Sequence, residues 1–166
     1  MTPKNQKILN QVINYIAENE FKFSQIDEQP KLLIEYENGG GYEWQIVAEV
    51  EEGITRAKIV FYSIIPDYIS LSKGYFDKVG EFFNRINYRQ IKIGSFELDY
   101  NSGFAHCKTS IKINPTLHNT EAIDDLFYEN IRLMNKYIGG IKAVAEGKLD
   151  PEEAQIRGRI DHPVWE

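Results

Sequence analysis

The fold is decided by a stretch that begins with Asn84-Arg85-Ile86-Asn87, continues as GSFELDYNSGFAHCKTSIKIN over residues 94–114, and ends in a patterned segment from Thr120 to Ala145. The first part predicts the end of a helix. The second predicts two strands joined by the short turn Asn101-Ser102-Gly103. In the third part apolar residues recur at steps of three and four, which places them on one side of a helix. We therefore expect a sheet with this long helix lying across it.

The same periodicities predict the other elements. Alternation of apolar and polar residues indicates strands, and Gly or Pro marks their ends. The run Asn38-Gly39-Gly40-Gly41 fits a hairpin turn better than a phosphate-binding loop, because the segment after it alternates like a strand. Ser72 is a candidate cap of the second helix, and residues 21–30 are expected to form a loop. In chain order we predict helix 3–19, strands 31–37, 42–50 and 54–65, helix 72–85, strands 91–100 and 104–113, helix 120–145 and a short helix ending near residue 157.

This order predicts an α+β protein, a two-layer α/β sandwich of the type α-β(3)-α-β(2)-α. Its five-stranded, mostly antiparallel sheet would carry the helices packed on one face. The length of 166 residues fits one domain. We place that domain at residues 1–154 and a C-terminal tail at residues 155–166.

Composition restricts the partners. Hydrophobic residues make up 42% of the chain, which is enough for a folded core, and the net charge is -6 without a long Lys/Arg run. We therefore expect no nucleic acid as a partner. No apolar stretch is long enough for a membrane span, and the N-terminus lacks a signal-peptide core. With the lone Cys107, these features favour a cytoplasmic protein that has no membrane partner.

The residues that most often carry chemistry do not form a recognisable constellation. His106 and Cys107 are neighbours, and neighbours in a strand point to opposite faces, so they make a poor thiolate–imidazole pair. His118 and His162 lack the spacing to a second metal-binding residue. Ser95 follows a glycine but lies in a predicted strand, outside any nucleophile elbow. We expect no catalytic, metal or cofactor site, and no enzyme.

Two segments are more apolar than a one-sided sheet requires. Strand 54–65 is apolar on both faces in its second half, so either the C-terminal tail or a loop covers it, or it forms a surface for another subunit or partner. Helix 72–85 has a wide aromatic stripe, which either packs in the core or faces a second subunit. The candidate partner or dimer residues are Val60, Tyr62, Ile64, Tyr75, Val79, Phe82 and Phe83.

Three further residues need a structural explanation. Gly139 and Gly140 lie inside the predicted long helix, where each costs on the order of 1 kcal/mol relative to Ala. We expect a strand or another helix to approach closely there. Trp165, near the C-terminus, is either exposed in a loose arm or docked on an apolar surface.

The order of elements resembles the secretion chaperone-like fold, which type III secretion chaperones and the YbjN family share. The similarity to YbjN is carried by Phe83-Asn84-Arg85-Ile86-Asn87, by Gly94-Ser95-Phe96-Glu97-Leu98-Asp99 and by the turn glycine Gly103. The ending from Glu146-Gly147-Lys148 to Pro151-Glu152-Glu153-Ala154 is also similar. The resemblance covers residues 82–154, and an uncharacterised family of this fold from photosynthetic bacteria is similar to the chain as a whole.

The resemblance implies a protein that is often dimeric and that binds polypeptide without catalysis. We therefore expect a non-enzymatic protein-binding module, chaperone-like or a regulatory adaptor, that forms a homodimer and has an unidentified protein partner. One alternative is a small-ligand-binding sensory domain or an enzyme, with a pocket between the sheet and helix 120–145 near His106 and Tyr100. Another alternative is a structural subunit of a larger complex.

Overall fold

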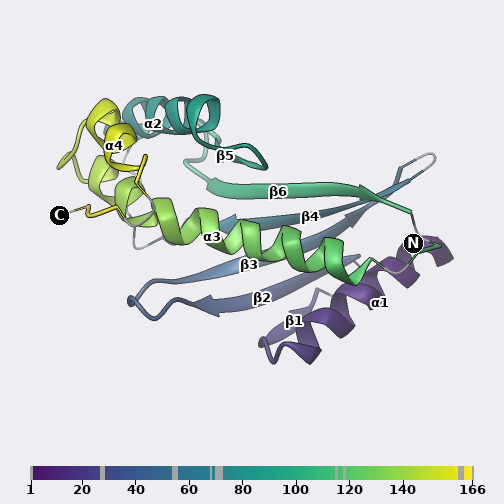
Figure 1. Cartoon of the computed structure of the whole chain (residues 1–166). Helices are drawn as coiled ribbons and strands as arrows, with labels where there is room; N and C mark the ends of the chain where they lie inside the picture. Colours follow the sequence, from purple (N-terminus) through teal and green to yellow (C-terminus); the bar gives the residue numbers. More distant parts are fainter. Residues whose placement is uncertain are drawn as a thin grey trace.

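The computed structural model describes residues 2–26, 29–53, 56–67, 69, 73–114, 116–117, 119–160 and 163–165. Six strands form one sheet (Figure 1), namely β1 (Phe23–Gln25), β2 (Lys31–Glu37), β3 (Glu43–Glu51), β4 (Ala57–Ile64), β5 (Ser95–Leu98) and β6 (Ala105–Ile113). The helices are α1 (Pro3–Glu18), α2 (Phe76–Arg89), α3 (Thr120–Ala145) and α4 (Pro151–Arg157), with a short 3-10 turn, Lys73–Tyr75, directly before α2.

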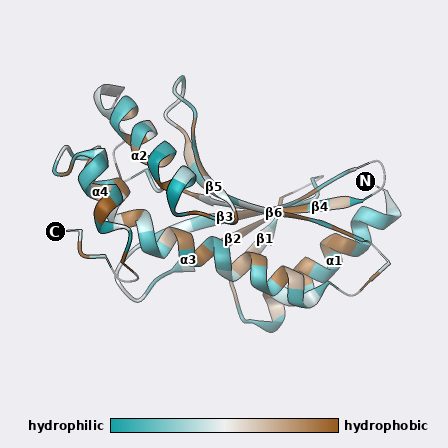
Figure 2. Cartoon of the chain, turned by 45° about the horizontal axis from the view of Figure 1, so that its top comes forward, coloured by the Kyte–Doolittle hydropathy of each residue, from teal (hydrophilic) through white to brown (hydrophobic). Residues whose placement is uncertain are grey.

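The sheet is antiparallel throughout and its strand order is β1-β2-β3-β4-β6-β5. Helices α1 and α3 lie on one side of it, whereas α2 and α4 lie beyond the β5 edge (Figures 1 and 2). The predicted α+β class is confirmed. Because α1 and α3 share one face, the inward side chains of the central strands form the core with them.

The prediction of five strands is wrong, because β1 forms inside the segment that we expected to be a loop. It has only three residues, all of them exposed, and it pairs with β2 from Phe23↔Ile34 to Gln25↔Leu32. So short a strand has no measurable alternation. Backbone pairing with β2 defines it rather than side-chain burial.

Strand β5 is also shorter than predicted, because the chain bends at Gly94. Gly94 has φ +92, and a Cβ at this position would lie 2.6 Å from the carbonyl oxygen of Lys108. Only glycine permits both the backbone angle and this approach. The strand therefore begins at Ser95. The predicted cap Ser72 lies outside the described residues.

A buried hydrogen-bond network joins α3 to the sheet through Asn130, which is 0% exposed. Its Nδ2 donates to the carbonyl oxygens of Phe61 (3.1 Å) and Cys107 (3.2 Å), which belong to neighbouring strands. Its Oδ1 accepts from the hydroxyl of Ser63, and that hydroxyl accepts from Nε1 of Trp44 at 3.0 Å. The position of α3 on β4 and β6 is thus set by directional bonds as well as by apolar contact.

Helix α2 protects the outer edge of β5 through Asn87. The side-chain Nδ2 of Asn87 donates to the carbonyl oxygen of Phe96 at 2.8 Å, and the amide of Phe96 donates to Oδ1 at 2.9 Å. The carboxamide thereby replaces the peptide group of a further strand. An edge covered in this way is unavailable for pairing with another chain.

The close approach at Gly139 and Gly140 comes from the C-terminal tail, and neither a strand nor a helix supplies it. A Cβ at Gly139 would lie 2.4 Å from Cδ1 of Trp165, and one at Gly140 would lie 2.7 Å from its Cζ3. The indole Nε1 donates to the carbonyl oxygen of Lys136 at 3.2 Å. The ring also meets Phe82 edge-on at 6.4 Å. Trp165 is therefore docked, and the paired glycines make the space for it.

We expect Trp165→Ala to lower the free energy of unfolding by about 1–3 kcal/mol, because it removes a half-buried indole and its hydrogen bond. Its neighbour Val164, 66% exposed, is the control, and Val164→Ala should change stability by less than about 0.5 kcal/mol. Urea unfolding followed by circular dichroism measures both. Equal effects of the two variants would contradict docking of the indole.

We expect Asn130→Ala to destabilise the protein by about 2–4 kcal/mol, because it leaves the buried Ser63 hydroxyl without its acceptor and opens a cavity. The control is Asn135→Ala, an exposed asparagine on the same helix, whose cost should stay below about 1 kcal/mol. Urea denaturation midpoints at equal m-values give the comparison. A cost at position 130 no larger than at position 135 would show that the network contributes nothing.

Candidate functional site

The prediction of a partner surface on α2 is wrong, because the side chains that were expected to form it point into this chain's own core. Val79, Phe82 and Phe83 are 0%, 0% and 3% exposed. Phe82 packs edge-on against Tyr137 of α3 at 6.3 Å, and Phe83 packs against Phe96 at 5.2 Å. The wide aromatic stripe is therefore needed inside the subunit, since one side of α2 meets β5 while the other meets α3.

Tyr75, the remaining predicted residue near α2, is half-buried. It lies in the turn before the helix, and a Cβ at Gly147 would be 2.8 Å from its hydroxyl oxygen. Gly147 has φ +71 and ends α3, so Tyr75 packs against the end of that helix. It contributes to the interior contacts of this end of the molecule.

The other predicted residues lie on the side of the sheet opposite α1 and α3, which we call the open face. Figure 2 shows no helix over it. Its middle row crosses the sheet in register from Leu33 to Val47, Tyr62, Lys108 and Ser95. We call Leu33, Val47 and Tyr62, which are all half-buried, the apolar stripe. Three adjacent strands thus present apolar side chains that no described helix covers.

Val60 and Ile64 flank Tyr62 on the open face of β4 but differ in exposure. Val60 is fully buried between its cross-strand neighbours Glu49 and Ser110, so the prediction that it forms part of an exposed partner surface is wrong. Ile64, paired with His106, is half-buried and extends the apolar area. The described part of the tail, residues 163–165, includes the Trp165 docked on α3, so it does not provide the cover that we considered for this face.

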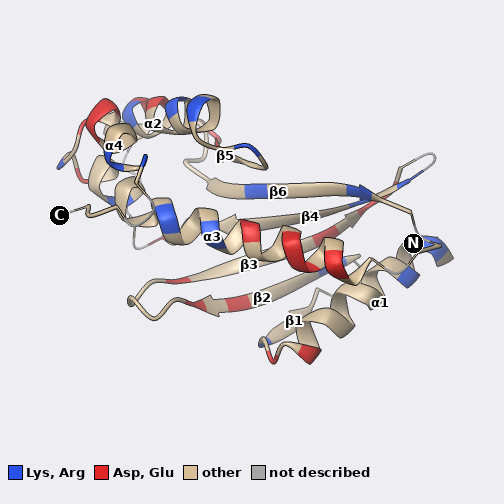
Figure 3. Ribbon diagram, viewed as in Figure 1, with Lys and Arg blue, Asp and Glu red and all other residues tan. Residues whose placement is uncertain are grey.

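Charge is unevenly distributed over the open face. The β2–β3 half carries Glu35, Glu37, Glu43, Glu49 and Glu51, against a single cation, Lys31. Beyond the central strand, β6 carries Lys108 and Lys112 (Figure 3). Three Lys–Glu pairs are closed within the chain, Lys31–Glu49 at 3.3 Å, Lys58–Glu51 at 3.0 Å and Lys108–Glu97 at 3.8 Å. The face is therefore acidic on the β2–β3 side of β4, whereas the side of β6 and β5 carries Lys108 and Lys112 against one carboxylate, Glu97, among the described strand residues.

His106 sits in a small polar cluster at the β5 end of this face. Its Nε2 lies 3.1 Å from Oε2 of Glu97, while Oε1 of that carboxylate accepts from the Ser95 hydroxyl at 2.9 Å. Burial lowers the pKa of His106, although the Glu97 charge opposes this. Partial burial works against ionisation of Glu97, but the Ser95 hydrogen bond and the Lys108 charge together keep its pKa below the usual value. Near neutral pH the cluster therefore pairs a neutral imidazole with a carboxylate.

Cys107 lies on the opposite face from His106, as expected from strand alternation. Its side chain is 0% exposed in the core, and burial raises the pKa of the thiol. A protonated, enclosed thiol is a poor nucleophile. The two residues therefore do not form a catalytic pair. Tyr100 does not join them either, because its hydroxyl lies against Gly80 of α2.

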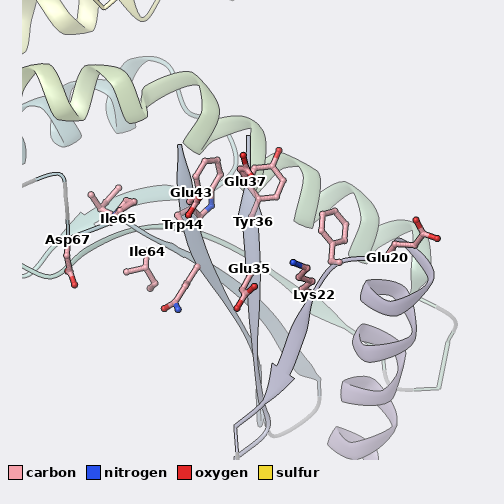
Figure 4. A pocket seen from close by; sticks show the side chains of 13 residues that line it. Glu20, Lys22, Glu35, Tyr36, Glu37, Glu43, Trp44, Ile64, Ile65 and Asp67 are labelled. Carbon is pink, nitrogen blue, oxygen red and sulfur yellow. The ribbon is translucent and has the colours of Figure 1, made fainter. Parts of the chain in front are cut away.

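A pocket of about 830 Å³ adjoins the open face where β4 ends, outside the space between the sheet and α3 (Figure 4). Phe21, Tyr36 and Trp44 provide aromatic walls, and the Tyr36 and Trp44 rings lie 4.6 Å apart. Among the described residues that line it, Lys22 is the one cation. The carboxylates around it are Glu20, Glu35, Glu37, Glu43 and Asp67. The pocket therefore extends the acidic half of the open face.

Within the described part of the chain, no group of three His, Cys, Asp or Glu residues is arranged to hold a metal ion. His118 and His162, which we considered as metal ligands and rejected, lie outside the described residues. None of the described helices combines the length and the apolar composition that crossing a membrane requires. Comparison with protein-family models gives no match, and comparison with curated proteins gives none either.

We expect protein stability to fall as pH drops below about 6.5, partly because of His106. Its pKa is lower in the folded state than in the unfolded chain, so the unfolded state takes up the proton first. This contribution is complete above the unfolded pKa and is lost below it. Urea midpoints between pH 5.5 and 7.5 should therefore fall less steeply for His106→Gln than for the wild type. Parallel slopes would contradict the lowered pKa.

Proposed function

We propose that this protein is a non-enzymatic protein-binding module, chaperone-like or a regulatory adaptor, that binds polypeptide through the open face of its sheet. The observation that carries the proposal is the apolar stripe of Leu33, Val47 and Tyr62, which is half-exposed on three adjacent strands. Sheets that face water usually alternate cleanly between apolar core residues and polar outer ones. A contiguous apolar break in that alternation is typical of an interaction surface.

The chemistry of the residues supports a binding role over catalysis. The imidazole of His106 has a carboxylate partner, Glu97, but among the described residues no hydrogen bond joins it to a nucleophilic side chain. Cys107 is buried on the other face, and the Ser95 hydroxyl bonds to Glu97 instead. To act as a general base, the imidazole would have to lie at hydrogen-bonding distance from the group whose proton it removes. The resemblance to the secretion chaperone-like fold supports the same conclusion, because it implies polypeptide binding.

We further propose that a second copy of this chain binds the open face, because the acidic β3 side of the face would then meet the β6 side, which carries Lys108 and Lys112. If two copies face each other about a twofold axis parallel to the strands and running along β4, the β3 strand of one copy lies over β6 of the other. Glu51 then faces the partner's Lys112, since both occupy the row of Lys58. An axis perpendicular to the strands would instead place acidic β3 on acidic β3, and that arrangement is repulsive.

The size of the face suits such a pair. Six strands spaced about 4.8 Å apart span about 24 Å, and eight residues of about 3.3 Å each span about 26 Å, which gives a plane of about 600 Å². Side-chain relief increases the true area toward the roughly 800 Å² per partner of an ordinary stable interface. The sheets would pack about 10 Å apart, with the two Tyr62 side chains facing each other on the axis and each Val47 facing the partner's Lys108.

Charge reversal tests this arrangement. We expect sedimentation velocity at micromolar concentrations to show a dimer, and Glu51→Lys and Lys112→Glu each to raise its dissociation constant about tenfold. The double reversal should restore association, because the facing pair is re-formed with opposite sign. In the double variant, Lys58 loses the neighbouring carboxylate at position 51 and gains one at position 112 of the same subunit. Lys148→Glu, at an exposed site away from the sheet, makes the same charge change and should leave the dimer intact.

A monomeric wild type, or reversals that do not rescue each other, would reject the second copy as the partner. Photo-crosslinking in native extract then shows whether the open face binds a different polypeptide or binds none. A photoreactive residue at Val47 should give discrete polypeptide adducts that Leu33→Glu in the same row abolishes. The same group at Tyr88, which is 83% exposed on α2, should give none. Adducts to a different polypeptide keep the binding function, and no adducts at all would overturn it.

The alternative function, a small-ligand sensor, rests on the pocket beside Tyr36 and Trp44. Its aromatic walls and carboxylates suit an organic cation. Within the described residues, however, the buried side-chain nitrogen and oxygen atoms without a hydrogen-bond partner are His106 Nδ1 and Gln155 Nε2. Neither residue lines this pocket. Because specific ligand sites use convergent polar groups, the open face is the better supported site.

A further inference from the structure

A second pocket, of about 470 Å³, lies where α2 and α4 end, away from the open face. It is lined by Tyr88, Arg89 and Gln90 at the end of α2, by Gln155 of α4 and by Arg159 just beyond α4. The described residues that line it are therefore five polar or amphipathic side chains, and none of them is a carboxylate. In a chain of net charge -6, a pocket with two arginines and no acid is unusual.

The base of this pocket is held rigidly. The Nε2 of Gln90 donates to the backbone carbonyl oxygen of Gln155 at 2.6 Å, and the hydroxyl of Tyr137 donates to Oε1 of Gln90 at 2.7 Å. Gly158 allows this packing, because a Cβ there would lie 2.9 Å from the Tyr137 ring. The pocket is thus built on a fixed contact between α2, α3 and α4.

Gln155 supplies a donor that the protein does not use. The residue is 4% exposed, and its Nε2 is buried without a hydrogen-bond partner in the described structure. An unsatisfied buried amide donor costs about 1–3 kcal/mol. A bound group would remove that cost by placing an acceptor oxygen within hydrogen-bonding distance of this nitrogen, which requires a small movement of the Gln155 side chain because Nε2 is buried.

The two arginines also lack an ion-pair partner among the described residues. Neither Arg89 nor Arg159 forms an ion pair with a described residue, although Arg85 and Arg157 on the same two helices bind Glu81 and Glu153. The guanidinium of Arg89 lies over the Tyr88 ring, 5.9 Å from its centre. Arg89 also complements the negative end of the α2 dipole, which accounts for its sign. That explanation does not extend to the adjacent Arg159 or to the unused amide of Gln155.

We propose that this pocket binds a compact oxyanion, a phosphate monoester or a carboxylate, between Arg89 and Arg159, with the Gln155 amide as a further donor. Planar guanidinium groups bind the paired oxygens of either anion. The carbonyl ends of two helices lie nearby and oppose negative charge, so we expect dissociation constants in the millimolar rather than the micromolar range. The site is independent of polypeptide binding at the open face.

Titration monitored by ¹H–¹⁵N NMR tests the proposal on the full chain, with inorganic phosphate in one arm and succinate in the other, at ionic strength matched with NaCl. Saturable shifts should include the side-chain amide of Gln155. The anion that saturates at the lower concentration identifies the preferred class. Arg89→Gln combined with Arg159→Gln should raise the dissociation constant at least tenfold, whereas Arg85→Gln, which removes a paired arginine of α2, should change it less than twofold.

Two results would overturn the proposal. One is a linear, non-saturating response to both anions, or none. The other is saturable binding that the double arginine variant leaves unchanged, because the anion would then be bound elsewhere. Gln155→Leu provides a second measurement if the arginine variant unfolds. It keeps the volume of the side chain, removes the amide, and should weaken anion binding about threefold or more while retaining the native spectrum.

Discussion

The structure depends on the buried amide of Asn130. A long amphipathic helix can rest on a sheet at many angles and offsets, because apolar contact alone is not directional. Asn130 removes that freedom by donating to β4 through Phe61 and to β6 through Cys107, while it accepts from Ser63. The Trp44 indole extends the network to β3. In any other position of α3 these polar groups would be buried without hydrogen bonds, which costs free energy. The observed position of α3 on the sheet is therefore more stable than nearby alternatives.

Once α3 is aligned, the rest of the helical layer follows from it. Its far end presents Tyr137 to Gln90 and to the rings of Phe82 and Phe96, so α2 is drawn to the β5 edge. There Asn87 takes the place of a missing strand. The paired glycines of α3 then receive Trp165, which ties the tail to the same end of the molecule. All of this apolar surface is used on one side of the sheet, and nothing described remains to cover the other.

Periodicity predicted most of this architecture, because it reports on burial. It placed β2 and α3 at their observed bounds and assigned His106 and Cys107 to opposite faces. It missed β1, whose three exposed residues are defined by pairing with β2 alone. It also assigned Val79, Phe82 and Phe83 to a partner surface, because a stripe pattern shows that a residue is apolar without showing what covers it. No sequence pattern predicted that Arg89 and Arg159 share a pocket. The two residues are 70 positions apart in the sequence, and only the contact between α2 and α4 brings them together.

The open face and the arginine pocket have different physical requirements, and the fold separates them accordingly. Polypeptide binding, which we propose for the open face, requires a broad, regular surface, and antiparallel strands provide one by repeating side chains in register. Anion binding, which we propose for the pocket between α2 and α4, requires a few donors held at fixed positions, and the ends of these two helices provide them when α3 fixes their contact. Both requirements act through α3, since Asn130 positions it on the strands and Tyr137 positions the base of the pocket. A shift in the position of α3 on the sheet would therefore change the structure of both surfaces, although they share no residue.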